Sequence, residues 1–405
     1  MSNFSILDQI LTNQKTEEVA ELDAVDIINN LFGELSDRER DVVVRRYGLH
    51  GQGKETLEKI GSVHNLTRER IRQIETSSVR KLQQLENLES YLKTLKHVIY
   101  QLMEEHGGIM ERDYLLNILV VFSLNGFKNK AEDEVVHKNY LNFLITKLLP
   151  NEFEEIINSA HFRHIYKLKY QTLEHLEELA EELLESIKNL KKIHTTEELI
   201  NLVLNLTSYG KHQDKLKAEN TLDISRVLKS ELFEENAEMV NAHKPLYSLL
   251  KAAKKIRQNK FGHWGIQNWR EIQPKTINDK IYLVLKHSGR PMHFAKIAER
   301  INEIGFDSKS ANPATVHNEL ILDDKYVLIG RGIYSLKEWG YEDGTVTEVI
   351  ENILKNANGP ISRDEIIDKV LEKRLVKKAT IILALMNKEK FLKENGKYTF
   401  NSSVK

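Results

Sequence analysis

Apolar residues recur every three or four positions along most of the chain, which is the spacing of helices with one buried face. Within residues 65–82, one side of such a helix would carry four apolar or small residues, Ile71, Ile74, Ser78 and Leu82. Short alternating segments follow tight turns at a few places, and six prolines and 19 glycines interrupt the 405 residues. The pattern predicts a mainly α-helical protein with short strands.

Two short helices joined by a tight turn are predicted within residues 56–82. Thr56 and Thr67 are suited to cap the two helices, Asn65 tolerates the left-handed turn, and Gly61 lets the helices cross closely. This is a helix-turn-helix, whose second helix characteristically enters the DNA major groove. Its polar side would carry Glu69, Arg72, Gln73, Thr76 and Arg80. Arginine can bond guanine, glutamine adenine and glutamate cytosine, so we expect DNA binding rather than an ordinary solvated face.

Residues 24–85 resemble region 4 of the bacterial sigma-70 family. The resemblance is carried by "LSDRERDVVVRRYGL" (35–49) and "TLEKIGSVHNLTRERIRQIETSSVRKL" (56–82), of which "TRERIRQIE" is the most specific part. It implies a helix, capped by Thr67, that reads the −35 promoter element. The resemblance assigns base contacts to Arg68, Glu69 and Gln73 and phosphate contacts to Arg70, Arg72 and Arg80.

The same resemblance has implications for the role in transcription. It implies docking on the β flap of RNA polymerase core through a hydrophobic surface of the region 4 helices. We identify no counterpart of region 2, whose aromatic and basic residues melt the −10 element. The expectation is therefore a sigma-like accessory factor rather than a complete sigma factor.

A weak internal repeat extends over the remaining three hundred residues. The pattern Gly-x-aromatic-x-apolar occurs as "GHWGI" (262–266), "GIYSL" (332–336) and "GKYTF" (396–400), with a degenerate copy, "HIYKL" (164–168). Each copy predicts a hairpin strand that buries the aromatic and the last residue. Matching upstream segments contain a helix, a break and a capped second helix, namely "HGGIMERDYLL" (106–116), "KKIHTTEELI" (191–200), "SGRPMHFAKIA" (288–298) and "NGPISRDEII" (358–367). This order is typical of a winged helix, although ordinary helix-loop-helix recurrence is an alternative.

The third copy carries a second resemblance. "INDKIYLVLKHSGRPMHFAKIAERI" followed by "YVLIGRGIYSLKEWGY" is similar to the HARE-type winged helix of the RNA polymerase delta subunit. We expect a sigma region 4 helix-turn-helix followed by tandem winged helices. The expected parts are an N-terminal helical extension (1–23), the region 4-like module (24–88), a degenerate winged helix (89–172), a winged helix (173–272), the HARE-type winged helix (273–342) and a C-terminal winged helix (343–405).

Charge and composition narrow the possible functions. The formal net charge is −1, so any affinity for DNA has to come from local patches such as residues 36–82, which hold eleven Lys/Arg against seven Asp/Glu. The absence of cysteine excludes disulfides, thiolate metal sites and a cysteine nucleophile. No apolar run approaches the roughly 18 residues of a membrane span. We expect a cytoplasmic, nucleoid-associated protein without a membrane partner.

Other candidate chemistry is sparse. "GLHGQGKE" (48–55) has the spacing of a phosphate-binding loop, but Glu55 stands where Mg²⁺ coordination needs Ser or Thr, so we interpret it as a loop between helices. "HFRH" (161–164) is a weak metal candidate, because the two histidines would lie on opposite faces of a strand with no carboxylate nearby. The acidic run 174–185 could be a solvated face or bind a basic partner, and the basic run 251–260 could touch phosphate.

No catalytic serine, carboxylate pair or metal motif was found, so we expect no enzyme activity, cofactor or small-molecule substrate. The leading hypothesis is a sequence-specific transcription factor that binds double-stranded DNA through residues 56–82 and acts with RNA polymerase. Two alternatives are the DNA-recognition component of a restriction or defence system, and a protein-binding adaptor to RNA polymerase.

Overall fold

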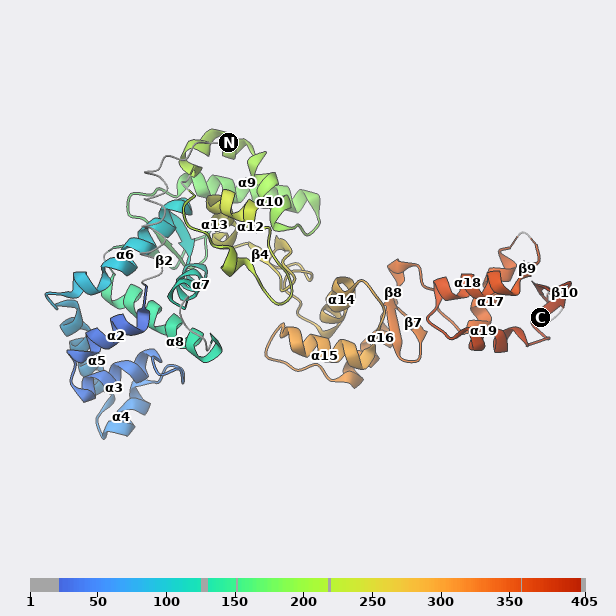
Figure 1. The fold of residues 1–405 in the computed structure, drawn as a ribbon, viewed down its shortest axis with the longest axis horizontal. Coiled ribbons are helices and arrows are strands. Elements are labelled where there is room, and N and C mark those ends of the chain that lie inside the picture. Colours follow the sequence, from blue (N-terminus) through green and yellow to red (C-terminus); the bar gives the residue numbers. More distant parts are fainter. Residues whose placement is uncertain (1–21, 125–129, 151, 218–219, 358, 402–405) are drawn as a thin grey trace. The chain divides into compact units, whose positions relative to one another are not determined.

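The computed structural model describes residues 22–124, 130–150, 152–217, 220–357 and 359–401. The chain divides into two compact units, Met1–Gln267 and Asn268–Lys405. Both are built of helices with small antiparallel sheets (Figure 1), as the sequence predicts. Most of the expected N-terminal extension, residues 1–21, lies outside the described residues.

The N-terminal unit begins with four helices that form the predicted helix-turn-helix module. They are α2 (Ala24–Gly33), α3 (Asp37–Tyr47), α4 (Leu57–His64) and α5 (Arg68–Gln83). Ser36 caps α3 in a reciprocal capping box with Glu39, and Gly48 ends that helix in the left-handed conformation. The small core of the module joins three of the helices through Val42, Ile60, Ile71 and Ile74.

A first winged helix follows in the same unit. Its elements are α6 (Leu88–Glu105), β1 (Ile109–Glu111), α7 (Arg112–Ser123), α8 (Lys130–Phe143), the π-helical turn η1 (Leu144–Leu148), β2 (Glu154–Ile156) and β3 (Ile165–Lys167). The strand order is β1-β3-β2. Tyr166 and Leu168, the aromatic and last residues of the degenerate repeat, are both buried.

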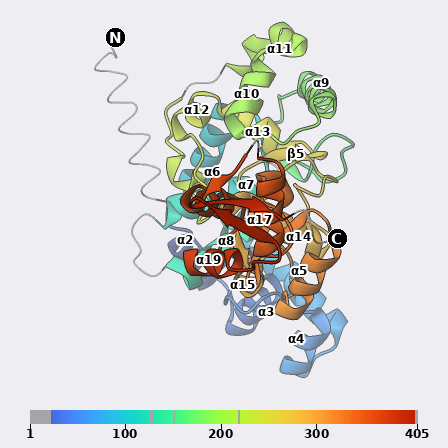
Figure 2. The ribbon, with the colours of Figure 1, turned by 90° about the vertical axis from the view of Figure 1, so that its right-hand side faces the viewer.

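A second winged helix of looser construction completes the N-terminal unit. It comprises α9 (Glu174–Leu190), α10 (Thr196–Leu204), α11 (Thr207–His212), η2 (Gln213–Leu216), η3 (Ser225–Leu228), α12 (Ala237–Ala242), α13 (Lys244–Ala252), β4 (Ile256–Gln258) and β5 (Trp264–Ile266). Helices α9, α10 and α11 pack together (Figure 2). A single bridge between His194 and Trp264 replaces the first strand. Trp264 is fully buried and donates its indole N–H to Thr196 at 2.7 Å.

The first two winged helices share an interface. Helix α13 packs against β1, and the Ser248 hydroxyl donates to the Ile109 carbonyl at 2.5 Å. At the start of α13, the buried Lys244 ammonium lies 2.5 Å from the Glu105 carboxylate of α6 and also donates to Asn220 and to the Leu222 carbonyl. Burial lowers the pKa of Lys244, although the neighbouring Glu105 opposes this shift.

The helix-turn-helix module packs directly on the first winged helix. Phe143 of α8 is fully buried, with its ring centroid 6.1 Å from that of Phe32 and 4.9 Å from that of Tyr47. The side chain of Gln83, at the end of α5, donates to the Lys147 carbonyl of η1 at 2.7 Å. The module and the winged helix are therefore joined by apolar packing and by hydrogen bonds.

The C-terminal unit contains two further winged helices. The first has α14 (Ile277–Ser288), β6 (Met292–His293), α15 (Phe294–Ile304), α16 (Pro313–Leu322), β7 (Tyr326–Gly330), β8 (Ile333–Leu336) and the turn η4 (Lys337–Trp339). The second has α17 (Val346–Lys355), β9 (Ile361–Ser362), α18 (Arg363–Lys373), α19 (Lys378–Leu385), β10 (Phe391–Glu394) and β11 (Lys397–Phe400). The Leu375 N–H donates to the Ile329 carbonyl at 3.2 Å and connects the two.

The sheets confirm the predicted hairpins and add a strand that the sequence did not predict. All four repeat segments form hairpin strands, and the aromatics Tyr166, Trp264, Tyr334 and Tyr398 are buried. The last residue is buried in two copies, as Leu168 and Leu336, but only half-buried in the other two, as Ile266 and Phe400. Three of the predicted breaks, however, contain a short first strand, β1, β6 or β9, which pairs with the hairpin in the order first-third-second. These strands have two or three residues, too few to show an alternating pattern.

The buried Lys244–Glu105 pair generates a stability prediction. Lys244→Met should cost about 3–5 kcal/mol of unfolding free energy, because it leaves a buried carboxylate without its counter-charge. The double variant Lys244→Met/Glu105→Gln should recover part of this loss. Urea-denaturation midpoints test the stability, and hydrogen exchange of α6 and α13 locates the change.

The matched control is Lys217→Met, which removes an exposed ion pair with Asp214 and should change stability by less than about 1 kcal/mol. Equal effects of Lys217→Met and Lys244→Met would contradict the structural role of the buried pair.

Candidate nucleic-acid interface

The turn between α4 and α5 has the geometry that the sequence predicts. Thr56 accepts the Lys59 N–H and Thr67 accepts the Arg70 N–H, each at 3.2 Å, so both threonines are side-chain caps. Asn65 ends α4 in the left-handed conformation with φ 53°. These local bonds set the direction in which α5 leaves the turn.

Gly61 is required by the close approach of the turn to α4. A Cβ atom at this position would lie 2.6 Å from the Leu66 carbonyl oxygen, closer than any relaxed contact. The same glycine carbonyl accepts the Leu66 N–H at 2.9 Å. A side chain here would push the turn away from α4 and misalign α5.

Helix α5 has a buried side and a fully polar exposed side. The four residues predicted to be buried are buried, and the Ser78 hydroxyl is satisfied by the Ile74 carbonyl at 2.7 Å. All predicted DNA-binding residues are exposed and lie on this helix or at its cap, namely Thr67, Arg68, Glu69, Arg70, Arg72, Gln73 and Arg80.

The exposed side chains of α5 are partly paired with one another. The Arg72 guanidinium contacts Glu69 through two nitrogens, at 2.7 and 2.9 Å. This pairing lowers the pKa of the Glu69 carboxyl. The Arg70 guanidinium donates to the Gln73 amide oxygen at 3.1 Å. Two candidate base-reading groups are thus each held by a neighbouring arginine.

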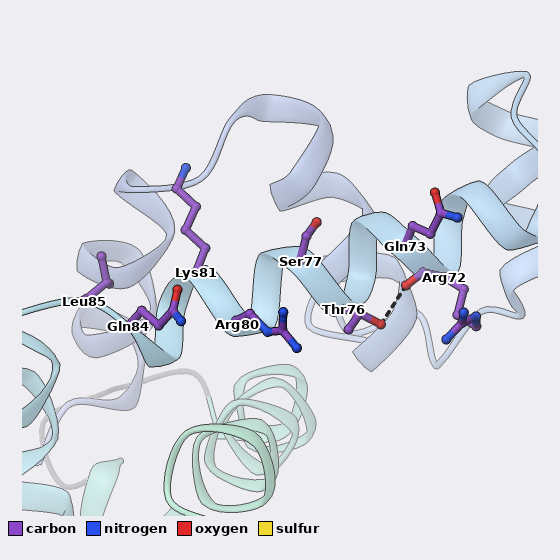
Figure 3. Close-up of a pocket in the computed structure, with 8 residues that line it drawn as sticks. All are labelled: Arg72, Gln73, Thr76, Ser77, Arg80, Lys81, Gln84 and Leu85. Carbon is purple, nitrogen blue, oxygen red and sulfur yellow. Dashed lines mark hydrogen bonds between the residues drawn. The ribbon is translucent and has the colours of Figure 1, made fainter.

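A hollow runs along the second half of α5. Figure 3 shows the eight residues that line it, Arg72, Gln73, Thr76, Ser77, Arg80, Lys81, Gln84 and Leu85. Five of them were not among the predicted DNA-binding residues, namely Thr76, Ser77, Lys81, Gln84 and Leu85. Ser77 and Lys81 follow Gln73 at intervals of four, so helical periodicity was the signal that could have found them.

A polar cluster behind α5 holds the helix against α3. The Tyr47 hydroxyl donates to Glu75 at 2.8 Å, and the Arg46 guanidinium lies 3.4 Å from the same carboxylate oxygen. Burial raises the pKa of Tyr47, so the phenol remains protonated and continues to donate this bond. The arrangement fixes the rotation of α5 about its axis.

The phosphate-loop-like segment 48–55 is a loop after an amphipathic helix, as predicted. Glu55 pairs with Lys59 at 2.9 Å and with Arg45 at 3.5 Å, which places it in the scaffold of the module. This explains why the segment carries glutamate where a nucleotide site needs a hydroxyl.

The prediction for the metal candidate "HFRH" (161–164) needs correction. Carboxylates do lie near "HFRH", because His164 is 2.6 Å from Glu155 and His161 is 3.4 Å from Glu181, but each histidine has its own glutamate. Among the residues described by the structure, no group of three potential ligands is placed to hold a metal ion. The described helices also include none long and apolar enough to cross a membrane.

Some members of the basic and acidic runs have partners within the protein, whereas Lys254, Lys255, Arg257 and Lys260 of the basic run are exposed. In the basic run, the Lys251 ammonium lies 5.0 Å from both the Tyr247 and the Trp264 ring centroids and donates to Gln258, so it does not face phosphate. In the acidic run, Glu178 pairs with Lys211 at 2.6 Å. Tyr247 precedes Lys251 by four residues on the same helix, so helical spacing could have revealed it, whereas Trp264 and Lys211 lie on other elements.

Residues 31–84 match the family model for sigma-70, region 4. The RNA polymerase sigma factor SigA of Microcystis aeruginosa is 54% identical over 55 residues, which are 14% of this chain and 13% of that protein. The sigma factor RpoS of Coxiella burnetii is 38% identical over 71 residues, which are 18% of this chain and 20% of that protein. The chain thus spans a fifth or less of the length of these relatives, and no solved structure matches it. The region 4 resemblance is confirmed for this segment, and the HARE resemblance of residues 273–342 stays a prediction.

The geometry of Gly61 generates a test of the interface. Gly61→Ala should destabilise the helix-turn-helix by about 1–3 kcal/mol, because the added methyl collides with a backbone carbonyl that cannot rotate away. We expect a lower melting temperature together with weaker DNA binding, measured by thermal denaturation and fluorescence anisotropy. Gly33→Ala is the control, since a Cβ there meets nothing within 4 Å. A Gly61→Ala protein that melts like Gly33→Ala would disprove the close approach.

Proposed function

We propose that the protein is a sequence-specific, double-stranded-DNA-binding transcription factor that reads DNA through α5 and acts with RNA polymerase. The observation that carries the proposal is the exposed polar side of α5 within the segment that matches sigma-70 region 4. We place its site of action on nucleoid DNA in the cytoplasm.

We assign roles along α5 by the chemistry of the side chains. Arg68, Glu69 and Gln73 are proposed to contact base edges, since they can bond guanine, cytosine and adenine respectively. The remaining predicted residues, Thr67, Arg70, Arg72 and Arg80, are proposed to hold the phosphate backbone. On binding, Arg70 and Arg72 exchange their intrahelical partners for phosphates and release Gln73 and Glu69 toward the bases.

In the first two winged helices, the helix at the reading position packs inside the protein. The helix that precedes the hairpin corresponds to the reading helix of a helix-turn-helix. In the first winged helix this is α8, which contacts α2, and in the second it is α13, which contacts β1. Both are used for internal packing, so we propose that DNA reading in the N-terminal unit falls to α5. We retain the six predicted parts of the chain, with their boundaries, as part of this proposal.

The polymerase part of the proposal rests on the relatives, which are named RNA polymerase sigma factors. The resemblance implies a hydrophobic docking surface on the region 4 helices. In this chain Phe143 already contacts the rings of Phe32 and Tyr47. A polymerase helix that uses those rings has to displace α8 first.

Substitutions on α5 test the division between base and phosphate contacts. Arg68→Ala and Gln73→Ala should each weaken binding to a cognate site by about 1–3 kcal/mol and relax the preference at one base pair. Arg80→Ala should weaken binding to all sequences alike and reduce the salt dependence by about one phosphate contact. Site selection from a random duplex library followed by anisotropy titrations measures both effects. If Arg68→Ala loses the same binding free energy on cognate and on random DNA, Arg68 contacts phosphate rather than a base.

Promoter opening is expected to need another protein. The proposal includes no region 2 function, so core polymerase plus this protein should leave a linear −10/−35 promoter closed. Permanganate, which oxidises unstacked thymines, is the direct probe, and a complete sigma factor is the positive control. If thymines near the start site become reactive with only core enzyme and this protein present, the protein opens the promoter itself and is a true sigma factor.

A further inference from the structure

Helix α19 occupies the reading-helix position of the last winged helix, but its outer side is apolar. Ile381 and Leu385 face the core of this winged helix and are buried. Leu383 is 69% exposed and Met386, directly after the helix, is 66% exposed. Together with the exposed Ala379, they form a second stripe at the i, i+4, i+7 spacing.

A helix that is apolar on all sides is normally covered on all sides. Here no described residue covers the outer stripe of α19. Two more exposed apolar residues belong to adjoining segments, Leu375 before α19 and Leu392 on β10. Single exposed apolar residues are ordinary, whereas several in one small winged helix indicate an interaction surface.

Lysines flank this apolar stripe in the sequence, and two more lie on the hairpin of the same winged helix. Five exposed lysines form no ion pair with any residue described by the structure, namely Lys377, Lys378, Lys388, Lys393 and Lys397. The nearby Lys390, by contrast, pairs with Glu351 at 3.3 Å. The exposed acidic residues of the same segment are Glu389 and Glu394, so positive charge prevails.

We propose that the apolar stripe of α19 and the lysines that flank it in the chain form a docking surface for an acidic amphipathic helix of a partner protein. The surface comprises Ala379, Leu383, Met386, Lys377, Lys378 and Lys388. The apolar side of such a helix covers the stripe, and its flanking carboxylates face the lysines. Duplex DNA is a poorer fit, because a reading helix needs hydrogen-bonding side chains where α19 has Leu383 and Met386.

Helix α16 of the preceding winged helix provides an internal comparison. It also exposes apolar residues, Ile321 and Leu322, but the helix contains no lysine or arginine, and Asp323 and Asp324 follow it. An acidic partner is therefore expected to select α19 and avoid α16.

The test is selection from a phage-displayed library of random peptides, about 16 residues or four helical turns long, on the immobilised full-length chain. The enriched peptides should combine leucine, isoleucine, phenylalanine or methionine with aspartate or glutamate. Their binding, measured by fluorescence anisotropy, should weaken about tenfold in Lys378→Glu/Lys388→Glu and in Leu383→Ser/Met386→Ser. It should also weaken in 1 M salt, where the screening length is about 3 Å.

Ile321→Ser/Leu322→Ser on α16 is the matched control and should bind the peptides normally. All three double variants change exposed residues, and circular dichroism melting verifies that they fold. Enrichment of neutral or basic peptides, or no enrichment at all, would overturn the proposal. Two further outcomes would also overturn it. If duplex DNA binds the protein and this binding is lost in both α19 variants, the occupant is DNA. If the protein self-associates and Leu383→Ser/Met386→Ser abolishes the association, the occupant is a second copy.

Discussion

The burial of the Phe143 ring against Phe32 and Tyr47 is the contact on which the arrangement of the N-terminal unit depends. It joins a helix-turn-helix module with a small core of its own to a much larger body. Gln83 and Asn139 add hydrogen bonds across the same interface, to the carbonyls of Lys147 and Gly48. The orientation of α5 is therefore set by the first winged helix as well as by its own turn.

The same fold serves different purposes in its successive copies. In the first two, the helix before the hairpin is an internal packing element, and α13 even starts with the buried ion pair of Lys244 and Glu105. In the C-terminal unit, α16 and α19 keep an exposed side. The surface of α16 is neutral to acidic and that of α19 is apolar with lysines around it, so neither resembles the arginine-rich surface of α5.

The local structure was predictable where a few adjacent residues determine it. Thr56, Asn65 and Thr67 predicted the turn, and helical spacing predicted both sides of α5, because caps and periodicity act over one or two helical turns. The pairing of Arg72 with Glu69 was also within reach, since the residues are three apart on one helix. The short first strands and the glutamates beside His161 and His164 depend on partners on other elements, and no local pattern encodes them.

The intrahelical pairs on α5 also have a consequence for the DNA search that the proposed function requires. Attraction to random DNA comes from free cations that displace counterions from phosphates. In α5 the Arg72 charge is compensated by Glu69, and the chain as a whole has a formal net charge of −1. If α5 reads DNA as proposed, this compensation is expected to shorten residence on random DNA. Under the same proposal the pairs open where Glu69 and Gln73 gain base contacts, so recognition is coupled to a small rearrangement of side chains on α5.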